Sequence, residues 1–213
     1  MARIILGATG SVAAVRVPTL CSAFLDQGHE VRVAATEPAL HFFDRAALPR
    51  SVDLLRDADE WPAHRYARGD EVLHIELRRW ADLLVVAPLD ANSLAKFALG
   101  LCDNLLTCLF RAWDFEKPVV LAPAMNTLMW DKPATSRHLA QLWLDQTGAA
   151  APPLDWSLET AADHFAARAP SLILIPPQSK RLACGDIGMG AMAEAASIAE
   201  VVRAWAERAE SPA

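Results

Sequence analysis

Runs of consecutive apolar residues recur along this chain, and segments with helical features separate them. The runs Ile4–Leu6, Leu83–Ala87 and Pro118–Ala122 are continuous rather than alternating, which is typical of strands covered on both faces in a parallel sheet. Regular alternation of such strands with helices predicts an α/β fold with a doubly wound parallel sheet, of the Rossmann or flavodoxin-like type. A length of 213 residues suits one domain, spanning residues 1–213.

The expected strands and helices follow from the same pattern. Strands are predicted over Arg3–Ala8, Glu30–Ala35, Val52–Leu55, Leu83–Ala87, Pro118–Ala122 and, as the last strand, Leu172–Ile175. Helices are predicted over Ser11–Gln27 with a kink or break at Pro18, near Thr36–Phe43, and over Val72–Trp80, Ala91–Leu99, Asn104–Trp113, Pro133–Gln146 and Ser197–Arg208. The segment Asp57–Asp70 is expected to be a polar loop.

Composition limits the class of protein. Hydrophobic residues make up 53% of the chain, so a large core is expected. The net charge of −6 and the absence of a basic block argue against nucleic-acid binding, although backbone N–H groups can still hold a phosphorylated ligand. A start without a signal-peptide pattern and the lack of a transmembrane-length apolar run predict a cytoplasmic protein with no membrane partner.

The cysteines have neither CxxC nor metal-ligand spacing, so no metal is expected. Cys21, Cys102 and Cys108 fall in helical patterns and are expected in or near the core as free thiols in a reducing compartment. Cys184 differs because it lies in the glycine-rich string LACGDIGMGAMAE, residues 182–194. Such a string suits a flap over a small ligand, and its thiol is a candidate proton donor; the alternative is a buried cysteine in a turn.

Two turns follow predicted strands and carry polar groups. The turn Gly7–Ser11 leads from the first strand into a helix, where phosphate binding and a plain turn with Ser11 as helix cap are equal alternatives. Its GxxG spacing is not a dinucleotide fingerprint and fits a mononucleotide better. After Pro88, which is expected to end the central strand, Asp90, Asn92 and Ser93 crowd one helix start, where capping alone would need only one of them.

Two further features have competing interpretations. In the string PAMNTLMW, residues 123–130, Asn126 is either a helix cap or an amide that holds a carboxyl or amide group of a substrate. His74 is one of six histidines, and residue type alone does not single it out as a base.

The strings LACGD and PAMNTLMW, together with HIELRRWADLLVVAP, resemble the flavin-dependent cysteine decarboxylases from about Ile4 to Glu194. The resemblance implies FMN as cofactor, held by Gly10, Ser11, Val12, Asp90, Ala91, Asn92, Ser93 and Ala124 and more loosely by Thr36 and Phe42. It implies His74 as the catalytic base and Cys184 as the acid that reprotonates the product. Substrate contacts are implied for Asn126, Arg181, Ala183 and Met192.

The implied activity is that of a carboxy-lyase, the FMN-dependent decarboxylation of 4′-phosphopantothenoyl-L-cysteine to 4′-phosphopantetheine in coenzyme A biosynthesis. The resemblance also implies a homotrimer whose active sites lie between subunits, with the histidine contributed across the interface. The alternatives within this fold are a peptide cysteine decarboxylase, a flavin prenyltransferase and a phosphatase-regulatory subunit; the last would lack catalytic residues that are present here. The chain has no room for the ligase domain of bacterial fusions, so a stand-alone form is expected.

The segment at about 145–169 departs from the family pattern. Gly148–Pro153 is linker-like, and Trp156–Arg168 is compatible with a short extra helix, so we expect an inserted surface segment there.

Overall fold

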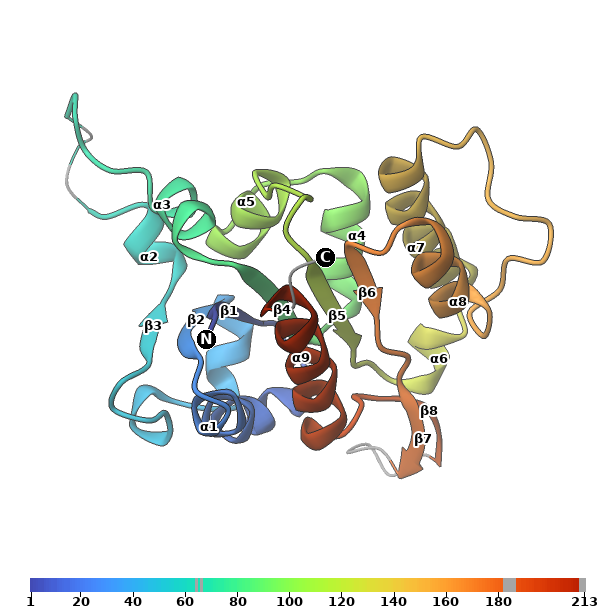
Figure 1. The fold of residues 1–213 in the computed structure, drawn as a ribbon, viewed down its shortest axis with the longest axis horizontal. Coiled ribbons are helices and arrows are strands. Elements are labelled where there is room, and N and C mark those ends of the chain that lie inside the picture. Colours follow the sequence, from blue (N-terminus) through green and yellow to red (C-terminus); the bar gives the residue numbers. More distant parts are fainter. Residues whose placement is uncertain (64, 66, 182–186, 211–213) are drawn as a thin grey trace.

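The computed structural model of the protein describes residues 1–63, 65, 67–181 and 187–210. A six-stranded parallel sheet forms the centre, with the strand order β3-β2-β1-β4-β5-β6 (Figure 1). Its strands are β1 Arg3–Ala8, β2 Glu30–Ala35, β3 Asp53–Leu55, β4 Leu83–Leu89, β5 Val119–Pro123 and β6 Leu172–Leu174. The predicted doubly wound parallel α/β fold is confirmed, and the strand order is that of a Rossmann-type sheet.

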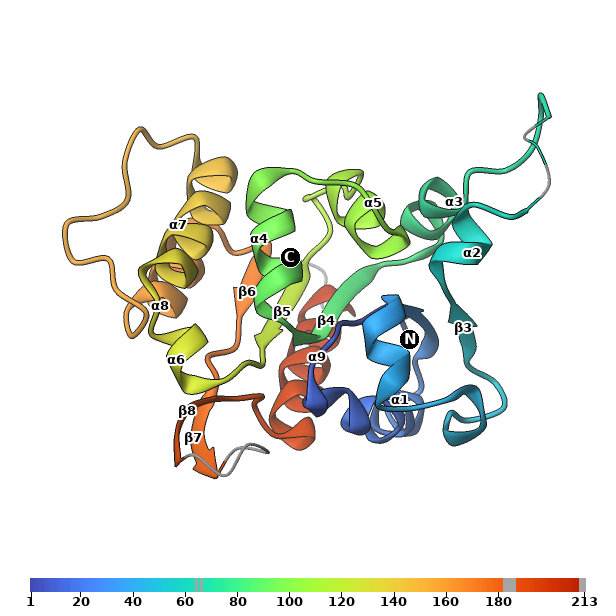
Figure 2. The ribbon, with the colours of Figure 1, turned by 180° about the vertical axis from the view of Figure 1, so that it is seen from behind.

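Helices cover both faces of the sheet (Figures 1 and 2). The α-helices are α1 Val17–Asp26, α2 Asp57–Glu60, α3 Leu73–Trp80, α4 Ala91–Leu99, α5 Leu105–Arg111, α6 Thr127–Trp130, α7 Pro133–Thr147, α8 Ala161–Arg168 and α9 Ala195–Glu210. Three 3-10 helices are η1 Val12–Arg16, η2 Glu37–His41 and η3 Arg45–Ala47. Helices α1 and α9 pack together on one face, whereas α4, α5 and α7 belong to the core of the other. Among the described residues, no helix combines the length and apolarity needed to cross a bilayer.

The continuous apolar strands pack against the cores on both faces of the sheet. All seven residues of β4 are buried. Leu84 and Val86 pack in one core cluster, while Leu83 and Val85 pack in the other. Successive side chains of a strand point to opposite faces, so a strand covered on both faces must be apolar at every position. Each fully buried aliphatic side chain contributes roughly 1.5–3 kcal/mol, which makes β4 a main source of stability.

Two predictions about strand ends are wrong. Pro88 does not end the central strand, because β4 continues to Leu89 through a cis Ala87–Pro88 bond and an irregular register against β5. β6 is not the last strand, because β7 Gln178–Arg181 and β8 Ile187–Ala191 follow it as an antiparallel pair outside the main sheet. The apolar-run criterion misses both strands, since the residues of β7 are all polar and glycines interrupt the apolar residues of β8.

One helix prediction is confirmed in detail and two need correction. The predicted Ser11–Gln27 helix is broken, as expected near Pro18, into η1 and α1, because proline lacks the N–H needed inside a helix and fits the first turn of α1. The expected polar loop Asp57–Asp70 begins with the helical turn α2. Cys102 lies outside any helix and is exposed, whereas Cys21 is buried in α1 and Cys108 is half-buried in α5.

Burial changes the acidity of two of these thiols. The pKa of Cys21 is raised to about 12, and that of Cys108 to about 11, because the core disfavours the thiolate.

The segment 145–169 contains the end of α7, an extended loop and α8. The short helix expected within it is present as α8. Trp156 of the loop stacks on His164 of α8, with ring centroids 5.7 Å apart, and Trp143 of α7 donates its indole N–H to the His164 carbonyl at 3.0 Å. These contacts attach the segment to α7 beside the sheet edge.

Candidate active site

The site lies at the carboxyl ends of β1 and β4, where the order of strands reverses. The chain leaves β1 toward η1 and α1 on one face, and leaves β4 toward α4 on the other. Neighbouring connections that diverge to opposite faces leave a crevice outside the strand ends, which is where ligands bind in open α/β sheets.

Hydrogen bonds join the two turns at this crevice. The buried Thr9 hydroxyl donates to the Pro88 carbonyl at 2.9 Å and accepts from the Asp90 N–H at 2.7 Å. The Asp90 carboxylate in turn accepts from the Ser93 N–H at 2.7 Å and caps α4. The turns after β1 and β4 are therefore one connected structure, and the polar groups predicted to bind the cofactor come from both.

Gly10 and Thr36 offer a direct test of whether this crevice fits a flavin nucleotide. A Cβ on Gly10 would lie 2.7 Å from Pro38 Cβ in η2 and 3.2 Å from the Asp90 carboxylate, so only glycine fits where the turn after β1 packs against them. The Thr36 hydroxyl, just after β2, is buried and has no hydrogen-bond partner among the described residues. A buried hydroxyl of this kind needs a partner, and a bound ligand can provide one. The residues fit a polar ligand such as FMN.

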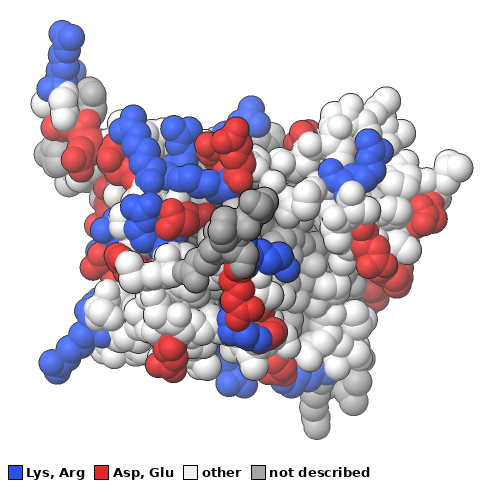
Figure 3. Space-filling view, viewed as in Figure 1, with Lys and Arg blue, Asp and Glu red and all other residues white. Residues whose placement is uncertain are grey.

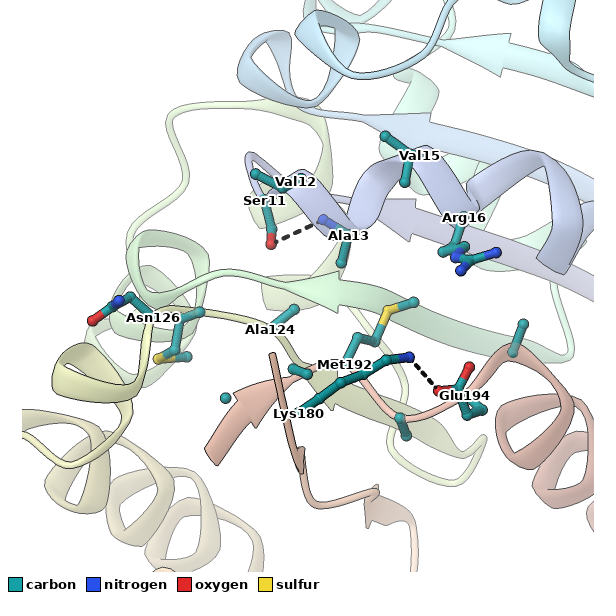
Figure 4. Close-up of a pocket in the computed structure, with 15 residues that line it drawn as sticks. Ser11, Val12, Ala13, Val15, Arg16, Ala124, Asn126, Lys180, Met192 and Glu194 are labelled. Carbon is teal, nitrogen blue, oxygen red and sulfur yellow. Dashed lines mark hydrogen bonds and ion pairs between the residues drawn. The ribbon is translucent and has the colours of Figure 1, made fainter. Parts of the chain in front are cut away.

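A pocket of about 320 Å³ opens beside these turns (Figure 4). Ser11 and Val12 line it from η1, Ala124 and Asn126 from the segment after β5, and Met192 from the segment after β8. The structure therefore brings together five of the predicted cofactor and substrate residues in one cavity. Arg16, Lys180 and Glu194 also line it, and these charged residues were not predicted as site residues.

The charged side of the pocket contains an ion pair. Lys180 Nζ lies 2.7 Å from Glu194 Oε1. The hydrogen bonds from Lys180 and Gln178 lower the pKa of the Glu194 carboxyl. Glu194 is therefore a carboxylate at neutral pH, which holds Lys180 against the segment after β8.

Strand β8 is docked on the segment that carries Asn126. The Met125 N–H donates to the Gly190 carbonyl at 2.9 Å. Gly190 has a φ of +129°, and a Cβ there would lie 2.2 Å from the Met125 carbonyl oxygen. The next residue, Asn126, accepts a bond from the Leu128 N–H at 2.8 Å through its side-chain oxygen and caps α6. Asn126 is therefore both a helix cap and a pocket residue, and the cap fixes the orientation of its amide.

His74 lies away from this pocket. It is in the first turn of α3, and α3 and the β7–β8 pair occupy opposite corners of the molecule in Figures 1 and 2. Its Nδ1 atom lies 2.7 Å from Glu60 Oε1, and its side chain is 21% exposed. His74 does not line the pocket that contains Asn126.

The remaining predicted residues have varied positions. Gly10, Thr36, Phe42 and residues 90–93 do not line the pocket itself. Phe42 is half-buried after η2, with its ring 5.1 Å from that of His41, and Asn92 is exposed in the first turn of α4. Ala183 and Cys184 lie outside the described residues, and Arg181 is described only as the end of the β7 backbone.

The sequence pattern does not single out Glu60, whose carboxylate contacts His74. The only local signal is the acidic run Asp57–Glu60, which on its own indicates a solvated surface. Its contact with a residue 14 positions later is a tertiary feature.

The family model described as "Flavoprotein" matches residues 1–207. The phosphopantothenoylcysteine decarboxylase of Arabidopsis thaliana is 51% identical over 205 residues, covering 96% of this chain and 85% of that protein. The enzyme of the same name from Mus musculus is 48% identical over 203 residues, covering 95% and 86%.

Solved structures agree with these relatives. A mutant PPC decarboxylase complexed with pantothenoylaminoethenethiol has a TM-score of 0.81 and 50% identity, covering 97% of this chain and 98% of that one. The FMN-binding protein AtHal3 has a TM-score of 0.78 and 50% identity, covering 97% of each chain. The chain therefore belongs to the flavoprotein family and is similar over nearly its whole length to phosphopantothenoylcysteine decarboxylases.

Proposed function

We propose that the protein catalyses the FMN-dependent decarboxylation of 4′-phosphopantothenoyl-L-cysteine to 4′-phosphopantetheine, a step of coenzyme A biosynthesis. One observation carries the proposal. The pocket that unites Ser11 and Val12 with Ala124, Asn126 and Met192 lies at the strand-order reversal of a chain about half identical to enzymes of that name. A similar structure holds pantothenoylaminoethenethiol, and another is described as FMN-binding.

The crevice between the β1 and β4 turns would hold FMN. The turn formed by Gly10, Ser11 and Val12 would hold its phosphate, with the N–H groups of Gly10 and Val12 as the proposed donors, because the Ser11 N–H already donates to the Thr9 carbonyl at 2.7 Å. The residues proposed to contact the rest of the cofactor are Thr36, Phe42, Asp90, Ala91, Asn92, Ser93 and Ala124. When bound, FMN supplies the oxidation of the thiol-bearing carbon and the later return of hydride, so the net reaction needs no outside electron donor.

The residues of this chain would position the substrate and move its protons. The amide of Asn126 is held in one orientation by its bond from Leu128, and an amide can pair with the carboxylate that is lost. His74 takes the proton of the substrate thiol, and Cys184 returns a proton to carbon after carbon dioxide has left. Arg181, Ala183 and Met192 contact the remainder of the substrate.

The separation of His74 from the pocket supports a site shared between subunits. His74 belongs to α3, whereas Asn126 and Met192 belong to the pocket near the β7–β8 pair. In the proposed homotrimer, His74 of one subunit would face the pocket of its neighbour, which accounts for their separation within one chain. We propose a cytoplasmic location for this trimer.

The test is an assay of purified protein with 4′-phosphopantothenoyl-L-cysteine. We expect a yellow protein that releases FMN on denaturation, forms carbon dioxide and yields 4′-phosphopantetheine. Turnover of a peptide with a carboxyl-terminal cysteine instead would establish a peptide cysteine decarboxylase. FMN binding without carbon dioxide release from either substrate would refute the enzymatic proposal and favour a regulatory subunit.

A further inference from the structure

We propose that Glu60 is a positioning residue of the active site, whose carboxylate fixes the ring orientation and the tautomer of His74. This inference rests on the proposed function, in which His74 is the base. It concerns how the base is prepared before substrate arrives.

Both oxygens of the Glu60 carboxylate contact the same residue. Oε1 lies 2.7 Å from His74 Nδ1, and Oε2 accepts from the His74 backbone N–H at 2.9 Å. Anchoring the ring and the main chain together removes the freedom of the ring to rotate about its side-chain bonds. The Glu60 side chain is only 5% exposed, while that of His74 is 21% exposed, so the buried carboxylate supports a ring that remains partly open.

The chemistry of the pair determines which ring nitrogen is basic. An ionised carboxylate only accepts hydrogen bonds, so the short contact requires the proton on Nδ1. In the neutral ring the lone pair is then on Nε2, and Nε2 is the atom that can take a proton from a thiol. Carboxylates that bond the second nitrogen of a functional histidine commonly set its tautomer in this way.

The fold holds Glu60 in place from a second direction. Helix α2 is four residues long and begins with Asp57, whose carboxylate accepts from the Leu105 N–H at 2.9 Å at the start of α5. Its last residue, Glu60, bonds the start of α3. Helices α3 and α5 also pack against each other, so α2 is attached to both. The contact of Asp57 with α5 therefore keeps the backbone of Glu60 close to the start of α3.

A merely structural role for Glu60 is the competing explanation. The Val72 side chain does not cap α3, and Glu60 provides a cap from outside the helix. A carboxylate at a helix N-terminus is also electrostatically favourable. A cap alone, however, needs no bond to the imidazole ring, so a measurement on the ring separates the two roles.

The test compares Glu60→Gln with the wild type and with Glu76→Gln as matched control. Glu76 is a half-exposed carboxylate on the same helix that pairs with Arg79 at 2.7 Å. In ¹⁵N-histidine-labelled, FMN-loaded protein, the imidazole nitrogen shifts of His74, assigned by their loss in His74→Asn, report the tautomer. We expect protonated Nδ1 in the wild type and in Glu76→Gln, and a mixture of tautomers in Glu60→Gln, whose amide can also donate to Nδ1.

In the decarboxylation assay we expect Glu60→Gln to lower kcat by about 10–100-fold with little change of KM. Glu60→Asp, which keeps the charge but has a shorter reach, should restore part of that loss. Unchanged nitrogen shifts in Glu60→Gln would overturn the proposal, as would altered shifts with unchanged kcat. If the wild type releases no carbon dioxide, the proposed function fails, whereas the nitrogen shifts still decide whether Glu60 sets the tautomer.

Discussion

Replacing the Cys184 thiol should separate the two halves of the proposed reaction. Cys184→Ser keeps His74 and Asn126, so oxidation and loss of carbon dioxide should proceed. Serine is a far weaker acid than a thiol, whose unperturbed pKa is about 8.5, so reprotonation should fail. We expect each site to release carbon dioxide once. The enethiol product should have two hydrogen atoms fewer than 4′-phosphopantetheine, which mass spectrometry would detect. Repeated turnover to 4′-phosphopantetheine would show that Cys184 is not the acid.

Asp82 connects the starts of two neighbouring strands. Its carboxylate accepts from the Arg3 guanidinium at 2.9 and 3.2 Å and from the Arg3 N–H at 2.9 Å. The side-chain bond from Arg3, opposed by partial burial, lowers the pKa of Asp82. Because the folded pKa lies below the unfolded one, the stabilisation is complete above the ordinary value near 3.9 and disappears as the pH falls through the folded value.

Asp82→Asn should therefore lower the free energy of unfolding at pH 7 by about 1 kcal/mol, a value reduced for the partial exposure of the pair. The difference from wild type should shrink in urea titrations below about pH 4. Asp53→Asn is the matched control, because Asp53 is 66% exposed and lies 3.5 Å from Arg32. A constant difference at every pH would mean that Asp82 acts through packing rather than charge.

The docking of β8 on the segment after β5 depends on a glycine. Gly190→Ala would force a Cβ against the Met125 carbonyl and a side chain into a positive-φ conformation. We expect a loss of about 1–3 kcal/mol in unfolding free energy and a raised KM, because the pocket wall shifts. Gly148→Ala is the control, since Gly148 also has a positive φ of +64° but no atom within 4 Å of a Cβ. That variant should lose stability while keeping KM; an equal KM effect in both would contradict the docking role.

Mixing two variants provides the test of the proposed shared active site. His74→Asn and Cys184→Ser subunits should each fail alone to make 4′-phosphopantetheine. If the site lies between subunits, random mixing should restore about a quarter of the sites, since each needs the intact residue from two different chains. The measurement is product formation after subunit exchange, with exchange followed by mass tags. No recovery despite complete exchange would mean that both residues act within one chain.

The charged surface shows why net charge says little about where ligands bind. On the face in Figure 3, basic and acidic side chains are intermingled over the part of the molecule that carries α3 and α5. The pocket itself combines an ion pair with apolar walls. The net charge of the chain limits the class of macromolecule that it can bind. The electrostatic field in the pocket depends instead on how neighbouring charged side chains pair.

The sequence by itself determined the architecture of this protein. The boundaries of β1, β2 and α4 agree with the predicted ones, because the apolar residues of β1, the mostly apolar residues of β2 and a capping residue such as Asp90 are local signals. The turns after β1 and β4 are candidate ligand sites on the same local grounds, since parallel strands bring their carboxyl ends to one edge, but the residues alone leave phosphate binding and a plain capped turn after β1 as equal alternatives.

Tertiary structure decided the rest. The passage of β4 through Pro88, the β7–β8 pair, the exposure of Cys102 and the contact of Glu60 with His74 have no local signature. Each depends on which distant backbone or side chain lies opposite, as Met125 lies opposite Gly190. Periodicity reports which face of an element is buried, but the partner across a contact is set only when the elements pack together.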